Sequence, residues 1–336
     1  MNRTFIIAEL SANHNGSIET ARRTIKAAAD AGADAVKLQT YTADTLTVDS
    51  RNECFMQRGG LWDGYSLYEL YKMAYTPWEW HRELFEYAGS LGLKAFSTPF
   101  DNSAVDFLES IGNPIYKIAS FEITDVNLIR YAASKGKPMV ISTGVSTYGD
   151  IKLAVDTCRE VGNDDITLLK CTSAYPATPD KANLGLIPEI ARKFGVKVGV
   201  SDHSLGDVIA TTAVALGASM VEKHLILDRN MGGADSGFSM QPEEFASMCS
   251  RIREVELTLG SAEFPADPST IPGRDICRSL FICEDVRKGD VLNEKNLRSI
   301  RPGCGLHPKY LNSCLGRRVN RDLEKGTPFS LDYLDS

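Results

Sequence analysis

The sequence has no stretch of about 18 consecutive apolar residues, the length that a membrane-spanning helix needs. Its first residues, Met1–Ala8, run directly into a strand-like segment and lack the longer apolar stretch and cleavage site of a secretion signal. Eight cysteines are scattered without a CxxC pair or a zinc-site spacing. These absences predict a cytoplasmic protein with free thiols and no membrane contact.

Positive charge is also in short supply. The chain has 37 Lys and Arg against 44 Asp and Glu, a formal net charge of −7. Because proteins hold nucleic acids through clustered Lys and Arg, this balance argues against a nucleic-acid partner. A small anionic substrate remains possible, since a few local cations are enough to bind it.

What the sequence does contain is an alternation of short apolar runs and helical patterns over its first 260 residues. The predicted strands are Phe5–Glu9, Ala35–Gln39, Lys94–Thr98, Ile115–Ile118, Met139–Ser142, Thr167–Lys170, Val196–Ser201 and Met220–His224. Helical period follows most of them, as at Ile18–Ala31, Asp125–Ser134, Asp207–Leu216 and Pro242–Leu259.

Short buried strands joined by helices form a parallel sheet, and eight such units over about 250 residues fit a closed barrel. We therefore predict an α/β fold, a (β/α)8 TIM barrel over residues 1–260. An open doubly wound sheet is the alternative. The absence of a GxGxxG motif after the first strand argues against that alternative.

Residues 40–76 form an abnormally long connection between the second strand and its helix. Strand-to-helix loops usually have about 2–6 residues, and much longer ones are functional or disordered. Disorder is disfavoured by the aromatic residues Tyr41, Phe55, Trp62, Tyr65, Tyr68 and Tyr71. We expect a folded lid or wall over the barrel mouth rather than a purely structural excursion.

The barrel pattern ends near Gly260. Residues 261–275 contain Pro265, Pro268 and Pro272 and read as a proline-rich linker. Residues 276–336 consist of short β-like runs and turns and form a predicted second domain. About 60 residues bury only a marginal core, so we expect this domain to dock on something larger.

Ionisable or hydroxyl side chains stand at the end of every predicted strand, where a (β/α)8 barrel carries its active site. Lysines supply charge and hydroxyls supply directed donors, so this set suits a phosphate or a carboxylate. The anion-binding candidates are Lys37, Thr98, Lys117, Ser120, Ser142 and Ser201. Strand parity places Glu222 and His224 on one face and points Lys223 the other way.

His203 and His224 end adjacent strands, where two imidazoles suit one divalent metal ion. Two protein ligands leave positions open for water and substrate, as a catalytic ion requires. Spacing alone does not choose between Mn²⁺, Co²⁺, Zn²⁺ and Mg²⁺. Cys171, which lies among these polar residues, is interpreted as a small buried hydrophobe.

These motifs, in this order, resemble the sialic acid synthase family over nearly the whole chain. The matching segments are Ala8–Gly16, Val36–Thr40, Phe96–Phe100, Lys117–Glu122, Ser142–Gly144, Cys171–Ser173, Ser201–His203 and Glu222–His224. The C-terminal domain, with Arg301-Pro302-Gly303, is similar to the antifreeze-like (SAF, β-clip) domain of the same family.

Within the family, the chain looks most like the pseudaminic acid synthases. The segments that carry this likeness are Gln39–Thr45, Gly60–Gly64, Tyr75–His81 and Arg301–Pro308. N-acetylneuraminate synthases usually differ in the long second loop and often have Asn where this chain has Ser173.

The resemblance implies a transferase that condenses phosphoenolpyruvate with an amino-sugar aldehyde and water, releasing phosphate. In the pseudaminic branch the sugar is 2,4-diacetamido-2,4,6-trideoxy-L-altrose. Phosphoenolpyruvate would be bound by Lys37, Thr98, Lys117, Ser120, Ser142 and Ser201. His203 and His224 would bind a divalent metal. Mn²⁺ is the ion expected, and Co²⁺ or Mg²⁺ are the alternatives. Glu9 would lie near the reacting carbons, which makes Glu9, Lys37, Lys117, His203 and His224 the expected catalytic set.

The resemblance also implies the residues that meet the sugar, Gln39, Glu122, Tyr175 and Asp235. Arg301 would reach the sugar from the partner subunit in a domain-swapped homodimer.

Other interpretations stay open at this point. An N-acetylneuraminate or legionaminic acid synthase would keep the same chemistry. A Schiff-base aldolase would use Lys170, at the end of the sixth strand, although no apolar surroundings that would lower its pKa are evident in the sequence. A non-catalytic sugar-binding protein would need neither a metal nor lysines for phosphoenolpyruvate.

Overall fold

The computed structural model describes residues 3–59, 62–261 and 263–335. The chain forms two compact units, Met1–Ser261 and Ala262–Ser336. None of the helices in the described ranges combines the length and apolar character needed to cross a bilayer.

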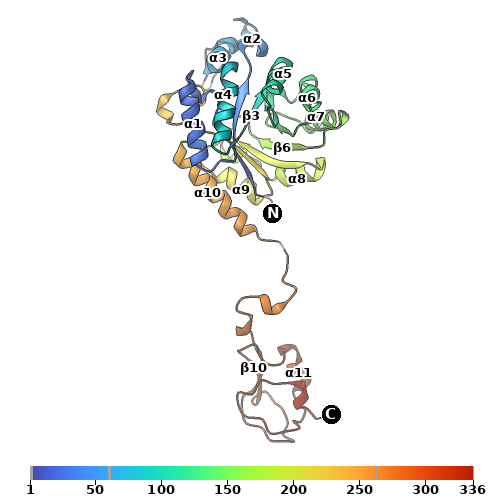
Figure 1. Cartoon of the computed structure of the whole chain (residues 1–336). Helices are drawn as coiled ribbons and strands as arrows, with labels where there is room; N and C mark the ends of the chain where they lie inside the picture. Colours follow the sequence, from blue (N-terminus) through green and yellow to red (C-terminus); the bar gives the residue numbers. More distant parts are fainter. Residues whose placement is uncertain (1–2, 60–61, 262, 336) are drawn as a thin grey trace. The chain divides into compact units, whose positions relative to one another are not determined.

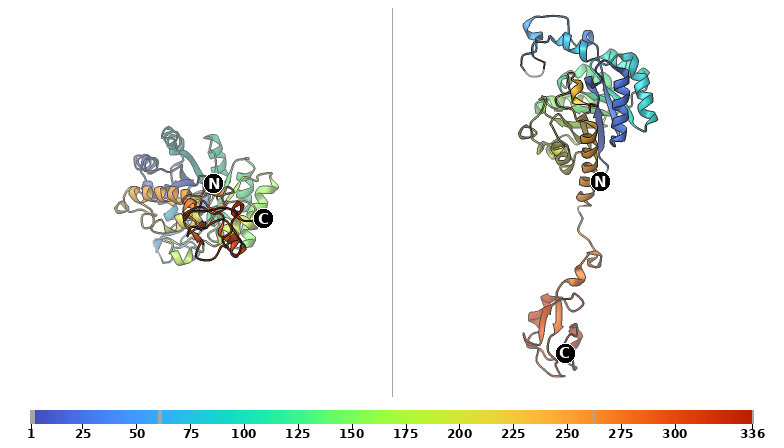
Figure 2. Two further views of the ribbon diagram at one scale, coloured as in Figure 1. Left: turned by 90° about the horizontal axis from the view of Figure 1, so that it is seen from below. Right: turned by 90° about the vertical axis from the view of Figure 1, so that its left-hand side faces the viewer.

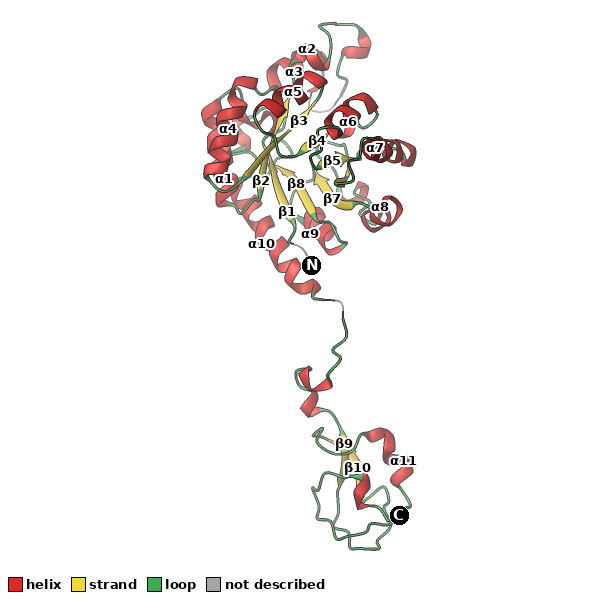
Figure 3. Cartoon of the chain, turned by 45° about the vertical axis from the view of Figure 1, so that its right-hand side comes forward, coloured by secondary structure: helices red, strands yellow, loops and turns green. Residues whose placement is uncertain are grey.

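The first unit is a closed barrel of eight parallel strands, ordered β1 to β8 around the ring, so the open-sheet alternative is wrong. The strands are β1 (Phe5–Glu9), β2 (Ala35–Thr40), β3 (Lys94–Pro99), β4 (Tyr116–Ile118), β5 (Met139–Ser142), β6 (Ile166–Cys171), β7 (Lys197–Asp202) and β8 (Met220–His224). The eight predicted strands are all present, with ends displaced by at most one residue. Figure 3 shows the yellow strands inside a ring of red helices.

Several of the helices that surround the barrel begin at side chains that cap them. Asp101 and Asp125 accept backbone N–H bonds at the starts of α5 and α6, and Thr147 and Asp150 form a capping box at α7. The helices are α1 (Ile18–Asp30), α4 (Trp78–Ser90), α5 (Asn102–Ser110), α6 (Val126–Ala133), α7 (Tyr148–Glu160), α8 (Leu186–Phe194), α9 (Val208–Ala215) and α10 (Pro242–Leu259).

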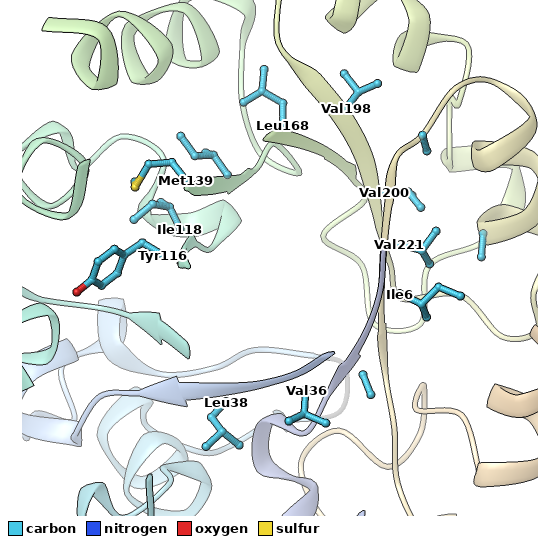
Figure 4. Close-up of a cluster of buried hydrophobic side chains, with 14 of the residues drawn as sticks. Ile6, Val36, Leu38, Tyr116, Ile118, Met139, Leu168, Val198, Val200 and Val221 are labelled. Carbon is cyan, nitrogen blue, oxygen red and sulfur yellow. The ribbon is translucent and has the colours of Figure 1, made fainter. Parts of the chain in front are cut away.

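Alternate side chains along each strand face opposite sides of the barrel wall. The outward set, drawn in Figure 4, packs against the helices and includes Val36, Leu38, Ile118, Val200 and Val221. The inward set forms a separate apolar layer inside the barrel. Its buried members are Ile7, Ala35, Phe96, Ile115, Val140 and Leu169.

The long connection after β2 is folded, although Gly60 and Leu61 lie outside the described residues. It contains α2 (Ala43–Leu46), a 3-10 turn at Glu53–Phe55 and α3 (Leu67–Ala74), and capping boxes start both α-helices. In Figure 2 this light-blue segment stands beyond the strand ends, on the side of the barrel away from the N-terminus.

The second unit holds β9 (Ser279–Ile282), which pairs antiparallel with β10 (Leu297–Ile300), and the short helix α11 (Leu311–Cys314) (Figure 1). Its own small core includes Leu280, Leu297 and Phe329. The predicted linker spans residues 261–275. Its described part, 263–275, clusters with this unit, and short 3-10 helices occur at Pro268–Thr270 and Arg274–Ile276. The backbone N–H of Gly303 donates to Asp275 O at 2.7 Å, which ties the end of that segment to the second unit.

Candidate active site

A pocket of about 560 Å³ opens at the carboxyl ends of the barrel strands. This volume is within the usual range for small-molecule sites. The sequence-predicted residues that line it are Glu9, Lys37, Gln39, Lys117, Ser120, Glu122, Ser142, Tyr175, Ser201, His203, His224 and Asp235.

The pocket floor arises from a change of residue type along the inward face of the strands. Ile7 is followed two residues later by Glu9, Ala35 by Lys37, and Ile115 by Lys117. The period of two keeps each pair on one face, so an apolar plug fills the lower barrel and charged groups lie directly above it. The floor is therefore supported from below by packed apolar side chains.

Four charged side chains meet on this floor. Lys37 Nζ lies 2.6 Å from Glu9 Oε2 and 3.8 Å from Glu222 Oε2. Lys117 Nζ donates to Glu222 Oε1 at 3.2 Å, and Ser201 Oγ donates to the same oxygen at 3.0 Å. All four charged side chains are at most 4% exposed. Charges in such a site interact far more strongly than in water.

Burial and these charges set the protonation of the floor. Burial lowers the pKa of Lys37, but Glu222 and Glu9 outweigh burial and raise it above the ordinary value. Burial also lowers the pKa of Lys117, and Glu222 only partly opposes this. Burial raises the pKa of Glu9, against the attraction of Lys37.

The hydroxyls of Ser120 and Ser142 line the same pocket as the two lysines. Ser142 Oγ is buried and has no hydrogen-bond partner in the described ranges. Ser120 Oγ accepts from the backbone N–H of Gly144 at 3.0 Å. A Cβ at Gly144 would lie 2.2 Å from Ser173 Oγ and 2.8 Å from Ser120 Oγ, so only glycine leaves these hydroxyls in place. An unpaired buried donor beside lysines suits an anion.

Thr98, predicted as an anion ligand, is not among the pocket-lining residues. Its Oγ1 accepts from Lys37 Nζ at 3.2 Å. In this structure Thr98 therefore holds the lysine instead of facing the pocket.

His203 and His224 lie side by side, with ring centroids 5.3 Å apart. His203 Nδ1 is 3.1 Å from the backbone oxygen of Thr172. Because a carbonyl only accepts, the neutral imidazole carries its proton on Nδ1, and its Nε2 then has a lone pair. His224 Nδ1 is buried without a hydrogen-bond partner among the described residues, and it lies 3.6 Å from Asp235 Oδ2. This pattern, with Nδ1 turned to an acceptor, is typical of metal-binding imidazoles.

An apolar wall, defined here as Tyr41, Leu67, Leu70, Tyr71 and Phe100, bounds part of the pocket. All but Phe100 come from the connection after β2. This confirms that the connection forms a wall of the pocket. Trp62, from the same connection, donates its Nε1–H to Ala234 O at 3.1 Å.

Sequence reasoning left Glu222 out of the candidate set. The structure places its carboxylate between Lys37 and Lys117. Strand parity was the signal that could have found it, because Glu222 shares a face with His224. Cys171, interpreted as a small buried hydrophobe, is buried as expected and also lines the pocket, with Sγ 3.8 Å from His203 Nδ1.

Two further lysines lie outside the pocket. Lys170 Nζ donates to Cys171 O at 2.7 Å and to Thr172 Oγ1 at 3.2 Å. Lys223 is completely buried on the outer face of β8, as its parity predicts. Arg301 belongs to the second unit and is exposed there. Neither lysine is among the residues that line the pocket.

Comparison with known proteins supports the family resemblance found in the sequence. The model of the NeuB family matches residues 24–264, and that of the SAF domain matches residues 278–334. The chain is 46% identical to the pseudaminic acid synthase of Helicobacter pylori, over 98% of this chain and 97% of that protein. It is 37% identical to the N,N'-diacetyllegionaminic acid synthase of Legionella pneumophila, over 99% and 95%.

Among solved structures, an N-acetylneuraminic acid synthetase from Leptospira borgpetersenii, crystallised with citrate, is 32% identical. Its TM-score is 0.72, over 80% of this chain and 89% of that chain.

Proposed function

The chain belongs to the NeuB family, and we propose that within it the chain is a pseudaminic acid synthase. It would condense phosphoenolpyruvate with 2,4-diacetamido-2,4,6-trideoxy-L-altrose and water, giving pseudaminic acid and phosphate. The observation that carries the proposal is the similarity to the pseudaminic acid synthase of H. pylori along nearly the full length of both chains.

The floor and the hydroxyls beside it suit phosphoenolpyruvate. Lys37 and Lys117 would balance its phosphate and carboxylate charges, and Ser120, Ser142 and Ser201 would donate hydrogen bonds. Thr98 would act indirectly, because its hydroxyl accepts a hydrogen bond from the Lys37 amine. Because these cations are fixed before the substrate arrives, they stabilise developing charge without reorganisation.

The reaction needs a bond between C3 of phosphoenolpyruvate and the aldehyde carbon. The electrons come from the enol double bond, and positive character develops at C2. Glu9 would stabilise the positive charge at that carbon and hold the water whose oxygen adds to it. One proton of the water goes to the former aldehyde oxygen, and the other stays on the new C2 hydroxyl until it leaves with the phosphate. The C2–O bond to phosphate then breaks, releasing phosphate and leaving the ketone. Burial of the Glu9 carboxylate strengthens this electrostatic effect.

His203 and His224 would hold a divalent metal, Mn²⁺ first and Co²⁺ or Mg²⁺ as alternatives. The fit rests on the protonation derived above, which leaves a lone pair on His203, and on the buried Nδ1 of His224 near Asp235. Such an ion, when bound, supplies Lewis-acid polarisation of a carbonyl oxygen.

The apolar wall supports a 6-deoxy sugar as the second substrate. A methyl group gains by leaving water for such a surface, whereas a hydroxyl there would need a partner. Gln39, Glu122, Tyr175 and Asp235 line the same pocket and would meet the polar groups of the sugar.

We further propose a domain-swapped homodimer in which Arg301 of the partner subunit reaches the sugar. Its support is the match of residues 278–334 to a SAF domain and the exposure of Arg301. All eight cysteines are unpaired, which supports a reducing, cytoplasmic location.

The test is phosphate release from phosphoenolpyruvate with Mn²⁺, using the diacetamido-trideoxy-altrose, N-acetylmannosamine or a legionaminic acid precursor, each with and without EDTA. EDTA-sensitive release with the first sugar alone is the expected result. Release only with N-acetylmannosamine would move the chain to the sialate branch, and release only with a legionaminic acid precursor would move it to that branch. No release with any sugar would overturn the proposed activity.

A further inference from the structure

The ends of β7 and β8 carry two different pairs on their two faces. On the inner face, Ser201 bonds Glu222 at 3.0 Å, and His203 stands beside His224. On the outer face, Asp202 is in register with Lys223. The two faces alternate residue by residue, so each histidine is covalently next to one member of the outer pair.

Asp202 and Lys223 form a completely buried ion pair. Lys223 Nζ lies 2.7 Å from Asp202 Oδ2, and the two side chains are 0% and 1% exposed. Replacing such a pair by apolar residues of similar size is often neutral or stabilising, so stability alone does not explain it. A buried charge pair instead fixes the geometry of the groups that carry it.

The ammonium of Lys223 also holds the turn that follows His203. It donates to Ser204 O at 2.5 Å and to Gly206 O at 3.0 Å, and Asp202 Oδ1 accepts from the backbone N–H of Ser204 at 2.8 Å. One side chain on β8 thus satisfies two carbonyls of the turn after β7. His203 lies between these anchors at Asp202 and Ser204.

We propose that the Lys223–Asp202 ion pair is a positioning device that keeps the His203 and His224 imidazoles close enough to share one divalent ion. The inference rests on the proposed metal site. Neither Lys223 nor Asp202 lines the pocket, so their effect passes through the backbone of β7 and β8.

The experiment measures Mn²⁺ affinity directly, by titrating metal-free protein with MnCl₂ and following the electron paramagnetic resonance signal of free Mn²⁺. Lys223→Met removes the ammonium at similar length. The double variant Asp202→Leu with Lys223→Met removes both charges, so it retains a neutral, packed outer face and serves where the single variant fails to fold.

A matched control variant disrupts a different ion network, which is partly buried and lies at the opposite end of the barrel. Arg253 bonds Asp34 Oδ2 at 2.8 Å, Thr4 O at 2.8 Å and Glu256 Oε1 at 2.9 Å. Arg253→Met therefore loses a comparable set of bonds far from the histidines. The thermal midpoint of each variant is recorded alongside its metal affinity.

We expect Lys223→Met and the double variant to bind Mn²⁺ about 10- to 100-fold more weakly, the usual cost of losing groups that orient metal ligands. Arg253→Met should bind Mn²⁺ as the wild type does, even where it melts earlier. Unchanged affinity in the Lys223 variants, or an equal loss in Arg253→Met, would overturn the inference. Absence of Mn²⁺ binding by the wild-type protein would instead overturn the proposed metal site.

Discussion

Glu9 Oε2 and Lys37 Nζ lie 2.6 Å apart at the bottom of the pocket, with both side chains almost fully removed from water. The pair joins the ends of neighbouring strands β1 and β2, which are in register at these two residues. The carboxylate therefore stays in place before any substrate is bound, and Gln39 Nε2 donates to its other oxygen at 3.2 Å.

Replacing Glu9 by Gln should lower kcat about 100-fold or more, since a fixed charge that acts on the transition state is lost. The KM for phosphoenolpyruvate should change little, because the lysines and hydroxyls that bind it remain. Steady-state kinetics at saturating sugar measures both. A kcat near that of the wild type would contradict the role given to Glu9.

Lys117→Met should raise the KM for phosphoenolpyruvate about 10- to 100-fold, the range expected for a lost hydrogen bond to a charged group. Lys170→Met is the matched control, since Lys170 is also buried but lies outside the pocket. Its KM should stay close to the wild-type value. Abolished activity in Lys170→Met, with borohydride trapping of pyruvate, would favour the Schiff-base aldolase.

Glu122 should make the unfolding free energy depend on pH. Burial raises its pKa to about 7 from an ordinary 4.5, although Lys117 opposes this. Between these values the folded protein holds a proton that the unfolded chain releases, so stability falls as pH rises through this window and then levels off.

Glu122→Gln should therefore shrink the difference in unfolding free energy between about pH 5 and about pH 8, by up to about 3 kcal/mol. Urea unfolding followed by circular dichroism measures it. Glu19→Gln, at an exposed position, is the control and should leave the difference unchanged. The same pH dependence in Glu122→Gln would show that other groups cause it.

Leu67→Asn places a polar group in the apolar wall. It should reduce kcat/KM for the 6-deoxy sugar about tenfold, the scale of one lost apolar contact with a methyl group. The KM for phosphoenolpyruvate should be unaffected. Leu153→Asn makes the same change on the exposed side of α7 and should be silent. Equal reductions of kcat/KM in the two variants would show that the apolar wall does not determine sugar specificity.

A mixture of Glu9→Gln and Arg301→Ala chains tests the domain-swapped dimer. Each variant alone should be nearly inactive. After mixing and subunit exchange, one site in each heterodimer has an intact Glu9 and the partner's Arg301, so about a quarter of wild-type activity should return. If Arg301 instead serves its own chain, no activity returns. Light scattering of the mixture checks that dimers are present.

The sequence was sufficient for the barrel because its strands are buried on both faces and read as short apolar runs between helices. It was insufficient for Glu222, whose significance depends on distances to Lys37 on β2 and Lys117 on β4. Thr98 has the correct parity, but its hydroxyl is taken up by Lys37. Spacing along the chain identifies which residues face the pocket, while the hydrogen-bond partners depend on contacts between distant strands.

The close approach at Gly144 restricts which residues can occupy this position. A Cβ at this position would force Ser120 and Ser173 to rotate away and would press on Cys171 Sγ at 3.1 Å. Every substitution of this glycine by another amino acid adds such an atom, so we expect no neutral substitution at this position. In a saturation-mutagenesis library selected for sugar-acid synthesis, substitutions at position 144 should be lost as completely as substitutions of Lys37. This is expected even though glycine has no side chain and contributes only a backbone N–H to the site.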